Sequence, residues 1–282
     1  MRDNPLSRLR HLLLGIVGCT FFTLLGCEGQ VNPQYNAATL SIDKAVDLDY
    51  LLYLPKNYSP EKSWPLVLYL TGIETAGDIE LINQHGPPRI IAEGLENDFF
   101  VLAPQLPGDA HWDAEALMVL LKDIQSEYAI DTARIYVTGF GDRGGYGCWD
   151  VATSYPGTFS KVAPISAPAC TEICRVGDVS IRIYHGKTDQ VVPIEDAENM
   201  RFELDYYCKA DVELKVFEGM GHQIWDTVYA DVEFWIWLIG SKPVSGVPGN
   251  KPLQKNFSTN LSRKVEDNYL LYLPKQYEKE DA

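Results

Sequence analysis

The chain has 282 residues, of which 46% are hydrophobic and 11% aromatic, and its formal net charge is −15. This composition supports one globular domain of about 200–250 residues with a full core. The acidic balance excludes the attraction to phosphates on which nucleic-acid binding depends, and it offers no basic patch for anionic lipid. The sequence also lacks the CxxC pairs and histidine spacing of a metal site, so we expect neither a metal nor another cofactor.

Residues 1–26 have the pattern of an export signal. Three arginines precede an uncharged apolar run over residues 12–25, which is shorter than the roughly 20 residues that span a bilayer. The run ends in Leu24-Leu25-Gly26-Cys27, which is similar to a bacterial lipobox. We therefore expect cleavage before Cys27, lipid attachment there, a polar tether over 27–40, and a cell-envelope location with membrane contact through the lipid. An ordinary signal peptide or an uncleaved anchor is the alternative.

Between residues 41 and 240, short β-rich runs alternate with amphipathic stretches, which indicates one domain. Strands are expected at 48–54, 65–70, 99–103, 134–138, 161–165, 180–185 and 212–217, and helices at 115–128, 145–155, 194–207 and 227–239. This alternation predicts an α/β fold whose mostly parallel sheet is covered on both faces. Such sheets place their chemistry at the carboxyl ends of the strands.

The composition changes after Gly240. Residues 241–262 are rich in proline and glycine and are expected to form a linker. Residues 269–277 then repeat residues 50–58 with one substitution in nine positions. Residues 263–282 are therefore interpreted as the truncated start of a second copy of the domain. We expect the chain from Lys242 onward to remain loose and to add nothing to the fold. The alternative is that it adds a strand to the sheet edge of its own or a neighbouring molecule.

Four cysteines remain after the signal and Cys27. They are Cys148, Cys170, Cys174 and Cys208. In an oxidising envelope two bridges with three possible connectivities are open to them. Cys170 and Cys174, four residues apart, are the easiest pair to close.

Three groups of motifs carry a family resemblance. The first group is residues 65–72 with Gly86-Pro87-Pro88 and Ala103-Pro104-Gln105. The second is residues 136–139 with residues 144–147 and Trp149. The third is His185-Gly186-x-x-Asp189-x-Val191-Val192-Pro193 with Gly221-His222 and Trp225. In this order they resemble the secreted carboxylesterase and prolyl-oligopeptidase-like branch of the α/β-hydrolase superfamily, close to polyhydroxybutyrate-depolymerase- and feruloyl-esterase-like proteins. The resemblance implies an α/β-hydrolase fold and the chain order nucleophile, acid, histidine.

Asp189 and His222 match the acid and the base of this family, and we expect their side chains within hydrogen-bond reach. The nucleophile turn differs. The family reads Thr-Gly-x-Ser-x-Gly-Gly, whereas this chain reads Thr138-Gly139-Phe140-Gly141-Asp142-Arg143-Gly144-Gly145, which is one residue longer and has no serine. Counting back from the paired glycines places Asp142 at the nucleophile position, and counting forward from Thr138 places Gly141 there.

Other parts of a site are also expected from the sequence. Backbone N–H groups of Gly72, Ile73 and Arg143 are the expected oxyanion donors. The expected pocket walls are the side chains of His111, Trp112 and Trp225. Asp142 or Gly141 is expected to cap the helix that follows the turn.

Three hypotheses about function remain open. The chain is an active ester hydrolase that uses Asp142, or an unexpected residue such as Ser166, as its nucleophile. Alternatively it is a degenerate hydrolase that binds an acyl or glycan ligand or a partner, or it is a fragment left by duplication. In the first two cases we expect a monomer that takes a small-molecule ester or acyl ligand.

Overall fold

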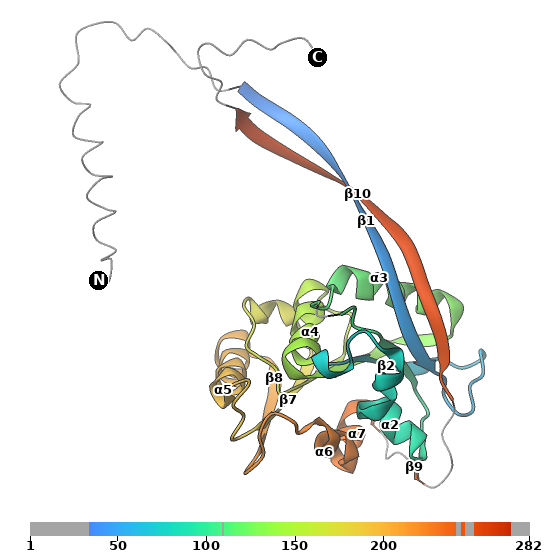
Figure 1. Ribbon diagram of the computed structural model, residues 1–282. Helices are drawn as coiled ribbons and strands as arrows, with labels where there is room; N and C mark the ends of the chain where they lie inside the picture. Colours follow the sequence, from blue (N-terminus) through green and yellow to red (C-terminus); the bar gives the residue numbers. More distant parts are fainter. Residues whose placement is uncertain (1–33, 109, 241–243, 246–250, 272–282) are drawn as a thin grey trace, which may run out of the picture. The chain divides into compact units, whose positions relative to one another are not determined.

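The computed structural model describes residues 34–108, 110–240, 244–245 and 251–271 (Figure 1). The predicted signal and Cys27 lie outside the described residues. The chain divides into two compact units, one of Lys44–Leu261 and one of Met1–Asp43 with Ser262–Ala282. In the second unit the described residues belong to two strands, and the Ser262 hydroxyl donates to the Asp43 carboxylate.

One eight-stranded sheet has the order β10-β1-β4-β2-β5-β6-β7-β8. Its strands are β1 (Gln34–Tyr53), β2 (Trp64–Leu70), β4 (Phe100–Pro104), β5 (Ile130–Phe140), β6 (Lys161–Ile165), β7 (Ser180–Gly186), β8 (Asp211–Phe217) and β10 (Leu253–Leu271). The strands from β4 to β8 run parallel, and β1 runs antiparallel to β4. Two short strands, β3 (Leu95–Glu96) and β9 (Val244–Ser245), pair separately. The predicted mostly parallel sheet is confirmed.

Helices cover both faces of the sheet. In β2, Leu66, Leu68 and Leu70 point into a core shared with α3 (Ala114–Glu127), α4 (Gly141–Ser154) and α5 (Ile194–Glu203). Val67 and Tyr69 point to the other core, with α2 (Gly86–Ala92), α6 (Trp225–Ala230) and α7 (Val232–Ile239). Every residue of β2 is buried, as expected for a strand covered on both sides.

All four predicted helices have different ends from those expected. α3 begins and ends one residue earlier, and α4 begins at Gly141 instead of Gly145. The helix expected over 194–207 is α5 followed by a π-helical turn, η4 (Leu204–Cys208). The helix expected over 227–239 is two helices, because the Asp231 carboxylate accepts the Glu233 N–H at 2.9 Å and starts α7 anew. α2 and the 3-10 turns η1 (Ile73–Thr75) and η2 (Ile79–Gln84) were not predicted from the sequence.

The prediction that the chain after Lys242 stays loose is wrong for β10, which starts within the expected linker and pairs with β1 at the edge of the sheet. Lys255 Nζ lies 2.7 and 2.9 Å from the two carboxylate oxygens of Glu127. Phe257 and Leu261 pack against the core. The alternate spacing of these contacts suits a strand with one buried face, and β1 offers an open edge. The expected tether also overlaps β1, which begins at Gln34.

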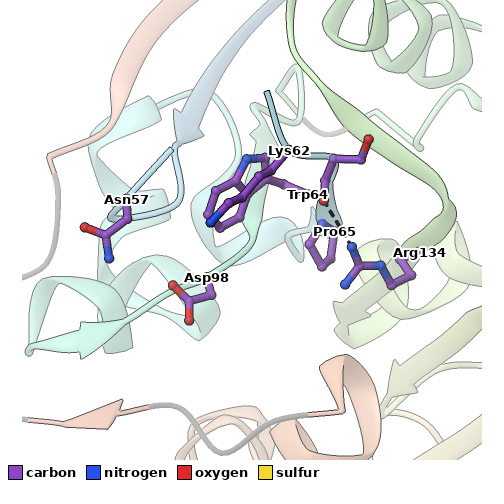
Figure 2. A pocket seen from close by; sticks show the side chains of 7 residues that line it. Asn57, Lys62, Trp64, Pro65, Asp98 and Arg134 are labelled. Carbon is purple, nitrogen blue, oxygen red and sulfur yellow. Dashed lines mark hydrogen bonds between the residues drawn. The ribbon is translucent and has the colours of Figure 1, made fainter. Parts of the chain in front are cut away.

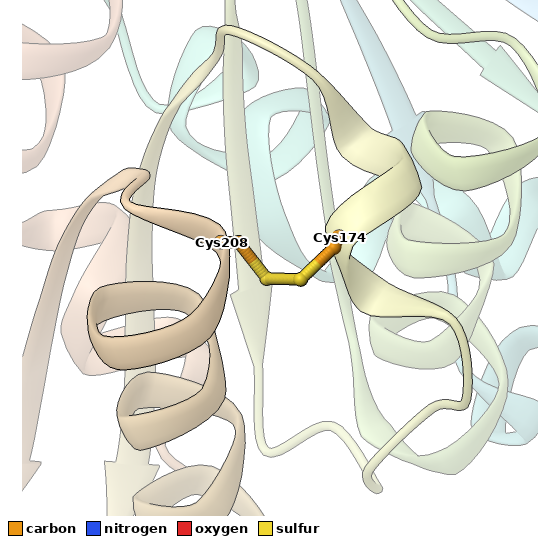
Figure 3. Close-up of a disulfide and its surroundings, with 2 residues drawn as sticks. All are labelled: Cys174 and Cys208. Atoms are coloured by element: carbon orange, nitrogen blue, oxygen red, sulfur yellow. A yellow bond between two sulfur atoms is a disulfide. The ribbon is translucent and has the colours of Figure 1, made fainter.

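A disulfide joins Cys174 to Cys208, so the pairing of Cys170 with Cys174, the easiest of those left open, does not form. A 3-10 turn, η3 (Ile173–Val176), faces η4 and brings the two Cα atoms to 5.0 Å (Figure 3). Cys148 and Cys170 are free. Burial raises the pKa of the Cys170 thiol to about 12 and that of Cys148 well above its usual value. Neither thiol is therefore a ready nucleophile at neutral pH.

Removing residues 251–282 deletes β10 from the edge of the sheet. We expect this truncation to lower the melting temperature by about 5 °C or more, because Phe257 and Leu261 lose their core contacts and β1 becomes a bare edge. Circular dichroism melting measures the change. Lys255→Ala, which removes a surface ion pair, is the control and should lower it by less than about 2 °C. Equal melting of the truncated and full chains would show that β10 does not contribute to the fold.

Candidate active site

The Asp189–His222 pair lies at the carboxyl end of the parallel strands. Asp189 follows β7 and His222 follows β8. His222 Nδ1 is 2.8 Å from Asp189 Oδ2, which confirms the predicted hydrogen bond. With Nδ1 bound to the carboxylate, the Nε2 atom of His222 points away from Asp189, as the corresponding atom does in a catalytic triad.

The Asp189 carboxylate is held on both of its oxygens. Oδ1 accepts the backbone N–H groups of Val191 and Val192, both at 2.9 Å. Oδ2 also lies 3.3 Å from Nε2 of His185, a fully buried histidine. The same Nε2 atom is 2.9 Å from the Val192 carbonyl oxygen. His185 was not assigned to the site from the sequence, although it lies next to the end of β7 and within the third motif. Its position makes it a support for Asp189.

The turn between β5 and α4 is packed tightly around glycines. A Cβ on Gly139 would collide with the Gly144 carbonyl oxygen, and a Cβ on Gly144 would collide with that of Leu70. A Cβ on Gly145 would lie 2.7 Å from Ala167 Cβ. These three positions have no room for a side chain, so the close approach of the strand and the helix requires glycine at each.

Gly141 stands at the apex of this turn and differs from its neighbours. Its φ of +71° is the conformation of a sharp strand-to-helix elbow. A Cβ there would meet nothing closer than 3.7 Å, and its nearest neighbour would be Nε2 of His222. Of the two registers considered in the sequence analysis, the structure therefore places Gly141 at the apex.

Asp142 lies one residue further on, in the first turn of α4. Its Oδ2 atom is 2.9 Å from Nη1 of Arg143, so the carboxylate is engaged in an ion pair. The prediction that Asp142 or Gly141 caps this helix is wrong, because α4 begins at Gly141 and Phe140 is the N-cap residue, without a side-chain hydrogen bond.

The expected oxyanion donors lie at two chain turns beside the elbow. Ile73 is the first residue of η1 and Gly72 is its N-cap, and N–H groups at the start of a helix lack partners within it. The second donor in such elbows comes from the residue after the apex. With Gly141 at the apex this residue is Asp142, so the expected assignment to Arg143 shifts by one position.

A cavity of about 570 Å³ opens over this arrangement. It is lined by Ile73, Glu74, Asp142, Val191, Gly221, His222 and Gln223. Glu74 was not assigned to the site from the sequence; its Oε2 would lie 3.9 Å from a Cβ on Gly141. Among the described residues, no group of three or more His, Cys, Asp and Glu side chains is arranged to hold a metal ion.

The three expected pocket walls do not line this cavity. Trp112 is buried in the core, where its Nε1 donates to the Thr71 carbonyl oxygen at 3.1 Å. Trp225 is also buried. Its ring stacks on that of Phe140 with 4.3 Å between the ring centroids, and it meets the His222 ring edge-on with 5.8 Å between the centroids. His111 is exposed. Trp225 therefore supports the histidine from the core side instead of contacting a ligand.

A second hollow, of about 450 Å³, lies at the amino ends of β2 and β5 (Figure 2). Arg134 Nη2 donates there to the Ser63 carbonyl oxygen at 3.1 Å. Parallel sheets carry their chemistry at the other ends of the strands. This hollow is consequently not part of the Asp189–His222 site.

Comparisons with known proteins agree with this geometry. Residues 114–238 match the phospholipase/carboxylesterase family. The bifunctional acetylxylan esterase/xylanase XynS20E of Neocallimastix patriciarum is 25% identical over 177 residues, which are 59% of this chain and 25% of that protein's length. A thermostable esterase of known structure is 26% identical with a TM-score of 0.59, over 73% of this chain and 63% of that one. Est1E from Butyrivibrio proteoclasticus has a TM-score of 0.52 at 16% identity, over 69% of this chain and 95% of that one.

The sheet order, the elbow and the aspartate–histidine pair define an α/β-hydrolase fold. The family match over residues 114–238 and the similar esterases support a carboxylesterase-like α/β-hydrolase family for this chain. The chain spans only a quarter of the length of the curated relative.

The elbow geometry can be tested by stability alone. We expect Gly144→Ala to lower the free energy of unfolding by about 3 kcal/mol or more, because its Cβ meets rigid backbone. Gly141→Ala should cost only about 1–2 kcal/mol, the penalty for a positive φ in a position that has room. Urea unfolding measures both variants. A larger loss for Gly141→Ala than for Gly144→Ala would contradict the placement of Gly141 at the apex.

Proposed function

We propose that this chain is an exported carboxylesterase-like domain that binds carboxylic esters and has glycine in the place of the catalytic nucleophile. The observation that carries the proposal is the position of Gly141, where a Cβ would lie 3.7 Å from His222 Nε2. The acid and the base are paired at 2.8 Å. Without a side chain at the apex, His222 has no hydroxyl to activate, so no acyl-enzyme forms.

Asp142 is a poor substitute for the missing serine. It stands one residue past the apex, and its carboxylate is paired with Arg143 at 2.9 Å. A nucleophilic carboxylate must point at the substrate from the elbow itself, within reach of water activated by the histidine. These contacts favour a binding role over hydrolysis through Asp142.

The charge beside the elbow opposes hydrolysis as well. Glu74 Oε2 would lie 3.9 Å from a Cβ on Gly141, close to where the oxyanion of an ester intermediate would develop. Active sites of this class surround that oxygen with hydrogen-bond donors. A carboxylate at this distance raises the free energy of the transition state. Hydrolysis by water activated at His222 is therefore slow.

The name of one relative supports a proposal for the class of ligand. The matched curated protein is named as an acetylxylan esterase, and the cavity over His222 is wide enough, at about 570 Å³, for a small acyl group with part of its alcohol. We assign to this site a small-molecule or carbohydrate-borne acyl ester, bound by a monomer.

Introducing the nucleophile should restore chemistry. We expect Gly141→Ser to raise the hydrolysis of p-nitrophenyl acetate by about 100-fold or more over the unmodified chain, because the serine hydroxyl would come within hydrogen-bond reach of His222. Initial rates under saturating substrate measure the gain. Adding Glu74→Gln to Gly141→Ser should increase the rate further, since the carboxylate beside the oxyanion is neutralised.

Two controls make this result specific. His222→Ala in the Gly141→Ser chain should abolish the gain, and Asp142→Asn in the same chain should leave it within about twofold. If the unmodified chain turned over more than about one ester per second, and lost this rate with Asp142→Asn, then Asp142 would be the nucleophile and the proposal would fail.

Attachment to the membrane is proposed to depend on lipid at Cys27. Among the described residues, no helix is both long and apolar enough to cross a bilayer. Each buried CH₂ of an acyl chain contributes about 0.8 kcal/mol to membrane binding. Expressed in a bacterium, the chain should enter the detergent phase on Triton X-114 partition, and Cys27→Ser should move it to the aqueous phase. Cys19→Ser, inside the expected signal, is the matched control and should not change the partition.

A further inference from the structure

Three aromatic side chains stand exposed at the end of α5 and in η4. Phe202 is 49% exposed, Tyr206 58% and Tyr207 67%. The rings of Phe202 and Tyr206 are stacked at 5.3 Å with an angle of 7° between their planes, and Tyr207 stands perpendicular to both. We call these three residues the aromatic platform. Scattered exposed apolar residues are common, whereas an ordered cluster of large rings marks an interaction surface.

The backbone under the platform is fixed. The π-helical turn η4 contains Leu204, which is fully buried, and Cys208, which is bonded to Cys174 (Figure 3). Lys209 Nζ lies 5.1 Å from the centre of the Tyr206 ring. Turns of this kind are often found at functional sites. A surface held in this way loses little conformational freedom when it binds a ligand.

A hollow with charged side chains in its lining adjoins the platform. It measures about 500 Å³ and is lined by Glu172, Ile173, Cys174, Arg175, Glu203 and Tyr207. Nη1 of Arg175 is 2.9 Å from Oε2 of Glu172. The exposed ring of Tyr207 therefore has charged groups beside it. The carboxylates of Glu172 and Glu203 accept hydrogen bonds, and the guanidinium of Arg175 donates them.

Charge and area decide between the possible ligands. The arginines near the platform are engaged with carboxylates, Arg175 with Glu172 and Arg201 with Asp205 at 3.1 Å. The surface therefore offers no cluster of cations for anionic lipid. At about 150–250 Å² for each ring, the exposed parts of the platform sum to about 350 Å², well under the roughly 800 Å² that each partner buries in a stable protein complex.

We propose that the aromatic platform binds a neutral polysaccharide. A pyranose ring presents an apolar face of C–H groups, which suits an exposed aromatic ring, and its hydroxyls both donate and accept hydrogen bonds. Glu172, Arg175 and Glu203 stand beside Tyr207 to meet such hydroxyls. No formal charge on the ligand is needed, in keeping with the absence of a cluster of cations on the described part of this surface.

This platform is separate from the ester site. Val192 bonds to Asp189 and stands just before α5, which then runs for ten residues toward the platform, a length of about 15 Å. The platform would hold one part of a polymer on the protein while another part of the same polymer reaches the ester cavity. Its binding depends on neither Gly141 nor His222, so it can be correct even if the proposed function is wrong.

Affinity electrophoresis tests the platform directly. The purified full chain in neutral detergent is run in native gels that contain soluble xylan, hydroxyethyl cellulose or dextran, with a gel lacking polysaccharide as reference. We expect retardation by at least one of these polymers, and an increase of about tenfold in Kd for Tyr207→Ala and for Phe202→Ala. Tyr207→Phe, which keeps the ring, should remain close to the unmodified chain.

Matched controls separate the outcomes. Ile236→Ala removes another exposed apolar side chain, on α7, and should not change retardation; His222→Ala should not change it either. Because Tyr207 is exposed, its replacement should leave the melting temperature nearly unchanged. The proposal is overturned if no polymer retards the unmodified chain, or if Tyr207→Ala is retarded equally. It is also overturned if Tyr207→Ala instead changes the oligomeric state on size exclusion, which would make the platform a protein interface.

Discussion

The Asp189 carboxylate is the point on which the geometry of the candidate site depends. Because this carboxylate is buried, its negative charge must be balanced by hydrogen-bond donors around it. The backbone N–H groups of Val191 and Val192 bind one oxygen, and His222 binds the other, with His185 3.3 Å away. These contacts join the ends of β7 and β8 and fix the orientation of the imidazole. The Nε2 atom of His222 is thereby aimed at the elbow between β5 and α4.

At that elbow the packing leaves one free position. Strand and helix approach so closely at Gly139 and Gly144 that no side chain fits, whereas Gly141 has room and faces the histidine. Around this position lie the Asp189–His222 pair, the tight turn and the start of η1, to which the proposed function gives the roles of acid, base, elbow and oxyanion donors. What distinguishes this chain is the absence of a side chain at the apex and the presence of Glu74 beside it.

Much of the fold and part of the site followed from the sequence. Strand β6 has the bounds that were expected, because a short buried run between turns has few alternatives. Asp189 and His222 were found because their positions follow strands and lie in recognisable motifs. The choice between Gly141 and Asp142 could not be made, since one inserted residue makes the register depend on the end from which it is counted. Only the three-dimensional packing around the glycines resolves it.

Other features depend on contacts between residues far apart in the chain. Cys174 pairs with Cys208 across 34 residues, whereas proximity in sequence favoured Cys170. Trp112 and Trp225 were expected in a pocket, but their direction is set by core packing that sequence spacing does not reveal. β10 was expected to be loose because one added edge strand rarely outweighs the ordering of a flexible linker, whereas it pairs with β1 from the start of the domain. His185 was overlooked because its partner Asp189 was assigned only to His222.

The most direct test of the account is covalent labelling at the apex. The full chain and its Gly141→Ser variant are incubated with an alkyl fluorophosphonate, which reacts with activated hydroxyl groups, and intact mass is measured. The account predicts that the unmodified chain stays unlabelled, while the variant gains one phosphonyl group on the introduced serine, and that this labelling is lost when His222 is also replaced by alanine. Labelling of the unmodified chain, at Ser166 or elsewhere, or a Gly141→Ser chain that never reacts, would contradict it.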